Sequence, residues 1–187
     1  GLKGALEQHR WVGEAVIRRD FPATLRIEIH PRRPAAVIAE AGGFRLVSRD
    51  GVILESAAEP PRTNLPLFRD ENGFRTDAAA KTAQAWACLD SLAPDAAARV
   101  ESLDLSDPGN IVLVLRGSPT RLLLGADRFA EKLDLFLEAE AWLRNRFGAL
   151  DYVDLRLFQD RVTVKPAAAA PQAPPAPLSP ILAKEAD

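Results

Sequence analysis

The sequence predicts an α+β fold in which a mostly antiparallel sheet is covered by two helices. Residues 25–30 alternate apolar and polar side chains, which is the period of a strand with two different faces. The pairs Gly42-Gly43 and Asp50-Gly51 stand between apolar runs, as hairpin turns do. Residues 127–147 repeat apolar residues at helical spacing, in a stripe wide enough to cover a sheet.

The first third of the chain is expected to be mostly strands. A short helix over residues 2–9 is followed by predicted strands over residues 11–19, 25–30, 35–39, 44–47 and 52–54. Pro31 and Pro34 each remove a ladder donor, so the chain should end a strand or change sheets between them. The five strands are predicted to form one β-meander on which later elements dock.

The middle and last thirds alternate helices and strands. Residues 56–73 predict a loop, and a helix should run from an N-cap at Asp77 to a stop at Pro94. Asp127 is the predicted cap of the second helix, and Gly148 its stop. The remaining predicted strands cover residues 100–105, 111–115, 121–124, 152–157 and 161–165.

The chain ends in a segment of different composition. Six of its 15 prolines fall between Pro166 and Pro180, interleaved with alanine. Such a segment buries too little apolar surface to offset the entropy of ordering. Residues 166–187 are therefore expected to form a disordered tail.

The composition argues against several broad classes of protein. The 187 residues are 47% hydrophobic and 27% charged with a net charge of −2, so no global field attracts nucleic acid or anionic lipid. No apolar run approaches the about 18 residues of a membrane-spanning helix. Because the chain has no methionine even at its first position, it is expected to be part of a longer protein whose membrane anchor lies elsewhere.

No catalytic or metal-binding set emerges. Cys88 could act as a nucleophile with His9 or His30 as its base, but an alanine-rich helix favours a packing role for the thiol. The two histidines and the cysteine lack metal-ligand spacing. Glu138 and Glu140 are expected on a solvated helix face. The sequence therefore predicts a protein without enzymatic activity, cofactor or metal.

Other conspicuous residues have structural explanations. The basic pairs 18–19 and 32–33 flank strand ends, where charge discourages edge-to-edge aggregation. The tryptophans at 11, 86 and 142 are expected in or beside the core. What remains is the last hairpin, whose final strand should have one unpaired backbone edge, and such edges bind extended peptides by strand addition.

Four stretches resemble one family. Residues 20–37 read Asp-Phe-Pro-Ala-Thr-Leu-Arg-Ile-Glu-Ile-His-Pro-Arg-Arg-Pro-Ala-Ala-Val, and residues 46–52 hold an Asp-Gly turn. Residues 65–67 read Leu-Pro-Leu, and residues 152–156 read Tyr-Val-Asp-Leu-Arg. In this order and spacing they resemble the bacterial cell-division family FtsQ/DivIB, over roughly residues 5–165. Pro31 and Ser48 depart from the family pattern, which usually has glutamate and aspartate there.

The resemblance implies a domain organisation. Residues 1–33 would be the C-terminal part of a POTRA domain, a helix plus two strands whose first strand and helix precede this chain. Residues 34–165 would be the β domain of the family. The cytoplasmic tail and the transmembrane helix of the family would also lie upstream.

The resemblance also implies function. Family members are non-enzymatic scaffolds of the division machinery, anchored by a single membrane pass with most of their mass on the extracytoplasmic side at the septum. They bind the small proteins FtsB and FtsL and help regulate septal peptidoglycan synthesis. FtsB adds a strand to the last strand of the β domain, which places the expected partner-binding residues at Arg156, Leu157, Phe158, Arg161, Val162, Thr163 and Val164.

One alternative remains from the sequence. POTRA-type modules also act in chaperone or translocation systems that handle extended outer-membrane polypeptides. Such modules usually occur in tandem before a barrel, and the Pro/Ala-rich tail argues against that arrangement. A subunit of a cell-wall enzyme is disfavoured by the missing catalytic set.

Overall fold

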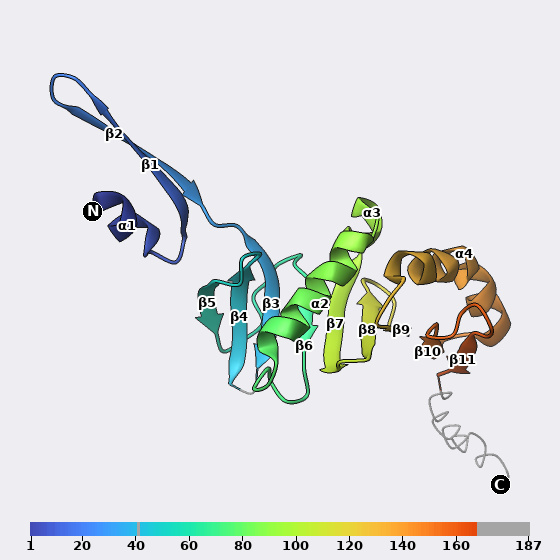
Figure 1. Ribbon diagram of the computed structural model, residues 1–187. Helices are drawn as coiled ribbons and strands as arrows, with labels where there is room; N and C mark the ends of the chain where they lie inside the picture. Colours follow the sequence, from blue (N-terminus) through green and yellow to red (C-terminus); the bar gives the residue numbers. More distant parts are fainter. Residues whose placement is uncertain (41, 168–187) are drawn as a thin grey trace, which may run out of the picture.

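The structure is a computed structural model that describes residues 1–40 and 42–167. It contains a small two-stranded unit and a large nine-stranded sheet (Figure 1). Most of the predicted tail, residues 168–187, lies outside the described residues.

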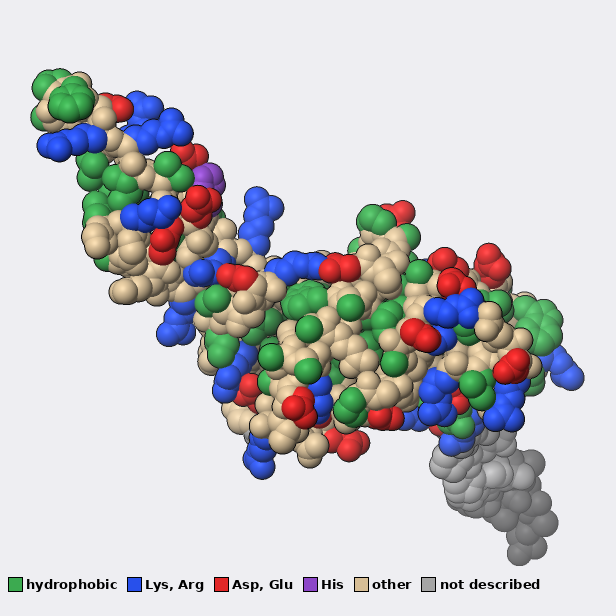
Figure 2. Space-filling view, viewed as in Figure 1, with side chains coloured by type: hydrophobic (Ala, Val, Ile, Leu, Met, Phe, Trp, Pro, Cys, Tyr) green, Lys and Arg blue, Asp and Glu red, His purple; other side chains and the backbone are tan. Residues whose placement is uncertain are grey.

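The small unit is a ribbon that projects from the large sheet (Figure 1). Helix α1 (Leu2–Glu7) precedes strands β1 (Val12–Asp20) and β2 (Thr24–Pro31), which pair antiparallel. Every residue of β2 is exposed, including the apolar stripe Leu25, Ile27 and Ile29. Figure 2 shows hydrophobic side chains at the surface of this end of the molecule. The period of two was therefore a correct sign of a strand, but no described element covers its apolar face.

The nine-stranded sheet has the order β11-β10-β9-β8-β7-β6-β3-β4-β5. Its strands are β3 (Pro34–Glu40), β4 (Gly43–Ser48), β5 (Ile53–Ala57), β6 (Leu67–Arg69), β7 (Val100–Asp107), β8 (Asn110–Leu115), β9 (Arg121–Gly125), β10 (Leu150–Asp154) and β11 (Thr163–Pro166). Three neighbouring pairs are parallel, namely β3 with β6, β6 with β7 and β9 with β10, and the other five are antiparallel.

The helices α2 (Ala78–Ser91) and α4 (Phe129–Phe147) contact each other and share one core with the sheet. A short helix, α3 (Pro94–Ala98), follows α2. The alternating buried residues of the central strands face these helices, with Leu113, Leu122 and Val153 fully covered. This confirms the predicted fold class, a helix with two strands followed by a mostly antiparallel sheet with two covering helices.

The predicted single meander is wrong. The prolines at 31 and 34 do separate two sheets, as expected, because the chain leaves β2 at Pro31 and enters the other sheet at Pro34. The first two strands therefore pair only with each other, while β3, β4 and β5 form one end of the large sheet.

The predicted loop over residues 56–73 contains a central strand. Strand β6 has only three residues but pairs parallel with both β3 and β7. Its Phe68 is 0% exposed and packs edge-on against Trp86 of α2, with ring centroids 5.0 Å apart. The prolines that precede this strand and its short length hide it from an analysis of periodicity.

Two helix boundaries also differ from expectation. Pro94 does not end α2, which stops at Ser91, but begins α3, where proline suits the first turn. Asp127 does not cap α4, because Arg128 occupies that position in a left-handed conformation and no side chain caps the helix. The carboxylate of Asp127 instead accepts a hydrogen bond from Lys132. Gly148 ends α4 at a φ of 73°, as predicted.

A side-chain clamp joins the ribbon to the large sheet. Arg32 donates to the carbonyl of Val12 at the base of the ribbon (2.5 Å) and to Asp50 in the β4–β5 turn (2.9 Å). Ser48 donates its hydroxyl to Asp50 (2.5 Å). The hydrogen bond from Ser48, followed by that from Arg32, holds the pKa of Asp50 below its usual range.

Candidate partner-binding edge

The terminal strand β11 lies at one edge of the large sheet (Figure 1). It pairs with β10, placing Val164 opposite Val153 and Thr163 opposite Asp154. No strand within residues 1–40 and 42–167 pairs with its other side. The predicted strands were too long at this end, because β10 stops at Asp154 and β11 starts at Thr163. Residues 155–162 form the intervening turn.

Two hydrogen bonds show which backbone groups of β11 face outward. The Ala167 N–H donates to Ala149 at the β10 side, so alternation turns the backbone groups of Lys165 and Thr163 toward β10 as well. The Leu155 N–H donates to the Leu123 carbonyl of β9, so the backbone groups of the preceding residue, Asp154, face β11. Asp154 lies opposite Thr163, which agrees with the orientation inferred from Ala167. The N–H and C=O of Val164 therefore point away from the sheet.

The outward groups of β11 are few. Pro166 presents only a carbonyl outward, because proline has no N–H. Val162 belongs to the turn before β11, so the free edge is short and Val164 is the outward-facing N–H donor of the strand.

One face of this edge is apolar. Val162 and Val164 border a hollow of about 320 Å³ between β11 and α4. Trp142 is 62% exposed beside it, so the expectation that this tryptophan lies in or near the core is wrong. Its ring meets Phe147 edge-on at 6.0 Å. The hollow is lined by Leu135, Phe136, Ala139, Trp142, Leu143, Phe147, Val153, Leu155, Val162 and Val164.

The other face is polar and positively charged. A second hollow of about 320 Å³ is lined by Asp154, Arg156, Leu157, Arg161 and Thr163. Arg156 donates two hydrogen bonds to Asp154, at 3.0 and 2.7 Å, and its backbone N–H donates a third. The Arg156 guanidinium lowers the pKa of the Asp154 carboxyl, which stays ionised. Arg156 is thus held in place by its own neighbour in the chain.

The turn itself exposes one residue and anchors another. Leu157 is 53% exposed, and its carbonyl accepts the N–H groups of Asp160 and Arg161. Phe158 is half-buried against the core, and the guanidinium of Arg128 lies 4.6 Å from its ring centroid. All seven predicted residues therefore lie on β11 or on the turn before it, five of them exposed and Phe158 and Val164 half-buried.

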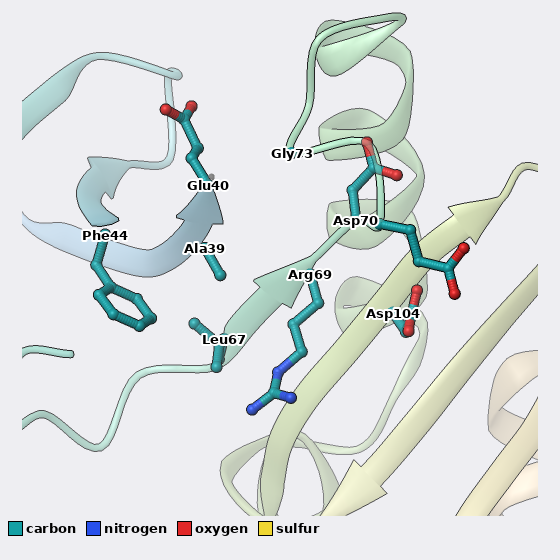
Figure 3. Close-up of a pocket in the computed structure, with 9 residues that line it drawn as sticks. Ala39, Glu40, Phe44, Leu67, Arg69, Asp70, Gly73 and Asp104 are labelled. Carbon is teal, nitrogen blue, oxygen red and sulfur yellow. The ribbon is translucent and has the colours of Figure 1, made fainter. Parts of the chain in front are cut away.

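A larger hollow of about 480 Å³ lies away from this edge, where β3, β6 and β7 meet (Figure 3). Arg69 and Asp104 come from adjacent strands, and Phe44 approaches from β4 (Figure 3). Several of its carboxylates already have partners. Glu40 pairs with Arg45 at 2.7 Å, and Asp104 accepts hydrogen bonds from Ser106.

Asp70, at the rim of that hollow, forms a buried ion pair with Lys81 of α2. The N–O distance is 2.8 Å, and the side chains are 0% and 6% exposed. Burial alone would raise the pKa of Asp70, but hydrogen bonds from Lys81 and from the Phe74 N–H outweigh it and lower the pKa.

The other residues considered for chemistry have structural positions. Cys88 is fully buried in α2, and burial raises the pKa of its thiol to about 12, which keeps it protonated. Within the described residues, no group of three or more His, Cys, Asp or Glu side chains could hold a metal ion. None of the described helices is long and apolar enough to cross a membrane.

Sequence reasoning missed the buried lysines. Lys132 lies three residues after Phe129 and four before Phe136, and Lys81 lies four residues before Ala85. That spacing puts both lysines on the buried stripes of their helices. A charge on an apolar stripe was the signal that could have revealed them.

Comparison with known proteins places the chain in a family. The family model described as "Cell division protein FtsQ/DivIB, C-terminal" matches residues 36–156. A cell division protein FtsQ from Mycobacteroides abscessus is 34% identical over 67% of this chain and 39% of its own length. The FtsQ of Koribacter versatilis is 27% identical over 92% of the chain and 53% of its own length. That of Allochromatium vinosum is 31% identical over 83% of the chain and 59% of its own length.

The chain thus spans about half the length of these curated relatives. The matched region runs from β3 to the turn that precedes β11, so it includes both helices that cover the sheet. The chain belongs to the FtsQ/DivIB family of bacterial cell division proteins.

Proposed function

We propose that this chain is a non-enzymatic scaffold of the division machinery that binds an extended segment of an FtsB- or FtsL-like protein at the free edge of β11. The observation that carries the proposal is the unpaired outer side of the terminal strand, where the N–H and C=O of Val164 point away from the sheet. An added strand would satisfy these groups with backbone hydrogen bonds.

Both faces of the edge support the same partner chemistry. Apolar side chains of the segment would pack beside Val162 and Val164, over the hollow against α4. On the opposite face, Arg156 and Arg161 favour an acidic residue in the segment. The proposed ligand is therefore an extended chain with alternating apolar and acidic side chains.

The cellular setting is part of the proposal. Since the relatives are longer than this chain, a single-pass membrane anchor would lie in the remainder of the protein, with the described residues on the extracytoplasmic side. Residues 1–33 would complete a POTRA domain with that remainder. Binding at β11 would help regulate septal peptidoglycan synthesis. Family membership favours this function over a translocation module.

The test is the affinity for the extracytoplasmic segment of the cognate FtsB-like protein, measured by isothermal titration calorimetry. Leu157→Lys is the cleaner variant, because Leu157 is exposed and its side chain makes no polar contact in the described residues. We expect it to raise Kd at least tenfold, about 1.4 kcal/mol. Where the added segment excludes water from its contact with Arg156, Arg156→Glu should weaken binding by about 2–5 kcal/mol. It also places a second carboxylate beside Asp154, so circular dichroism must accompany it.

Arg75→Glu is the matched control, since Arg75 is an exposed arginine in another part of the chain. It should bind like the parent. If Leu157→Lys and Arg156→Glu both stay folded and bind as tightly as the parent, the β11 edge is not the binding site.

A further inference from the structure

The ammonium of Lys132 is buried at the end of the sheet that carries the partner-binding edge. The residue is 1% exposed. Its Nζ donates to the carbonyl of Leu124 (2.7 Å), the carbonyl of Asp127 (2.8 Å) and the carboxylate of Asp127 (2.8 Å). An ammonium has three donors, and all three are used here. A buried charge is costly unless it has hydrogen-bond partners, and here protein oxygens satisfy every donor of the ammonium.

These hydrogen bonds fix the connection between β9 and α4. The connection bends at two positions of positive φ, Gly125 (76°) and Arg128 (51°). Lys132 donates to the carbonyls of Leu124 and Asp127, each of which immediately precedes one of these two positions. Since α4 has no side-chain cap, its side chains tie it to this connection through two contacts, the Lys132 ammonium and the Arg128–Glu131 ion pair, and only the ammonium is buried.

The same connection supports the turn over residues 155–162. A Cβ atom built on Gly125 would lie 3.6 Å from Lys132 Nζ and 3.5 Å from Arg156 Cγ, so the ammonium and the arginine stem meet at this glycine. The Phe158 ring centroid lies 5.8 Å from Lys132 Nζ and 4.6 Å from the guanidinium carbon of Arg128. Cation–ring contacts at these distances are attractive.

We propose that Lys132 is a positioning residue for the partner-binding edge. It is too buried to touch a partner, and it acts by holding the surface on which Phe158 and Arg156 rest. Its role in binding depends on the proposed function, whereas its role in ordering the turn does not. Losing the ammonium would leave two carbonyls without their donor and free the turn that leads into β11.

The chain offers a matched control in Lys81. This lysine is also buried, on the other covering helix, and also binds an aspartate. Lys132→Met and Lys81→Met both remove a buried ammonium and keep the unbranched stem, so both should lower stability. Only Lys132→Met should disturb the turn.

The experiment measures amide exchange by NMR in the 187-residue chain, together with affinity for the FtsB-like segment. The amides of Phe158, Asp160 and Arg161 report on the turn, because each donates a hydrogen bond within it. Their exchange rates are divided by those of β8 amides in the same sample. This ratio should be at least tenfold higher in Lys132→Met than in the parent, and it should be unchanged in Lys81→Met. Affinity should fall at least tenfold in Lys132→Met and less than twofold in Lys81→Met.

Phe158→Leu keeps the test decisive if Lys132→Met does not fold. It leaves the lysine network intact but removes the ring that rests on it, so the Asp160 and Arg161 amides should again exchange at least tenfold faster. Unchanged turn exchange in whichever variant folds would overturn the proposal. A third outcome is that turn amides exchange faster in Lys132→Met while both Lys132→Met and Leu157→Lys bind the FtsB-like segment as tightly as the parent. That outcome would support the positioning role of Lys132 and overturn the proposed function.

Discussion

Phe68→Ala is expected to lower the free energy of unfolding by about 3–5 kcal/mol, which is the usual cost of truncating a fully buried phenylalanine. Phe68 is 0% exposed in β6, the short strand that joins the two parts of the large sheet. The substitution would also remove the edge-on contact with Trp86 and open a cavity under α2. Urea unfolding monitored by tryptophan fluorescence and circular dichroism measures the loss.

The matched control is Phe21→Ala. Phe21 is 88% exposed at the tip of the ribbon, so the same truncation there should change stability by less than about 0.5 kcal/mol. Similar losses for the two variants would contradict the central place of β6 in the core.

Asp70→Asn is expected to cost about 3–5 kcal/mol at neutral pH, because it leaves the ammonium of Lys81 buried without its counter-charge. Asp90→Asn is the control, on α2, the helix that carries Lys81. Asp90 pairs with Arg49 at the surface, with side chains 54% and 56% exposed, so its loss should cost less than about 1 kcal/mol. Chemical unfolding of the three proteins gives the comparison, and equal costs would show that the buried pair adds nothing special.

The Asp70 pair also predicts a pH dependence. The pKa of Asp70 is lowered in the folded protein, so its stabilising contribution is complete above the unfolded pKa of about 3.9 and is lost as pH falls through the folded value. The difference in stability between the parent and Asp70→Asn should therefore stay constant from neutral pH to about pH 5 and shrink in more acidic solution. A difference that grows on acidification would contradict the assigned direction.

The sequence predicts most strands correctly because their apolar residues alternate or stand between turn residues. It does not show whether an apolar face is covered. The alternation of Leu25, Ile27 and Ile29 indicates a strand. Only the pairing in the structure shows that β2 lies outside the large sheet and is exposed. Strand β6 escapes detection since three residues are too few to show a period, and its pairing is entirely nonlocal.

The candidate site is predictable in position but not in detail. Alternation and chain order place a free edge near residues 161–165, and the structure has β11 at the edge of the sheet. Sequence alone does not show that the Arg156 side chain turns back onto Asp154, two residues before it. The helical spacing of Lys132 indicates burial, but not that its ammonium bonds the β9–α4 connection beneath the turn, because that depends on the path set by two positive φ angles.

The most direct test of strand addition follows individual backbone amides of β11 when the FtsB-like segment is added. NMR-detected exchange should slow strongly at Val164, whose N–H group faces outward, because an added strand supplies its acceptor. Thr163 and Lys165 should change little, because their N–H groups already face β10. Binding that leaves the Val164 amide exchanging as in the free protein would contradict pairing at this edge.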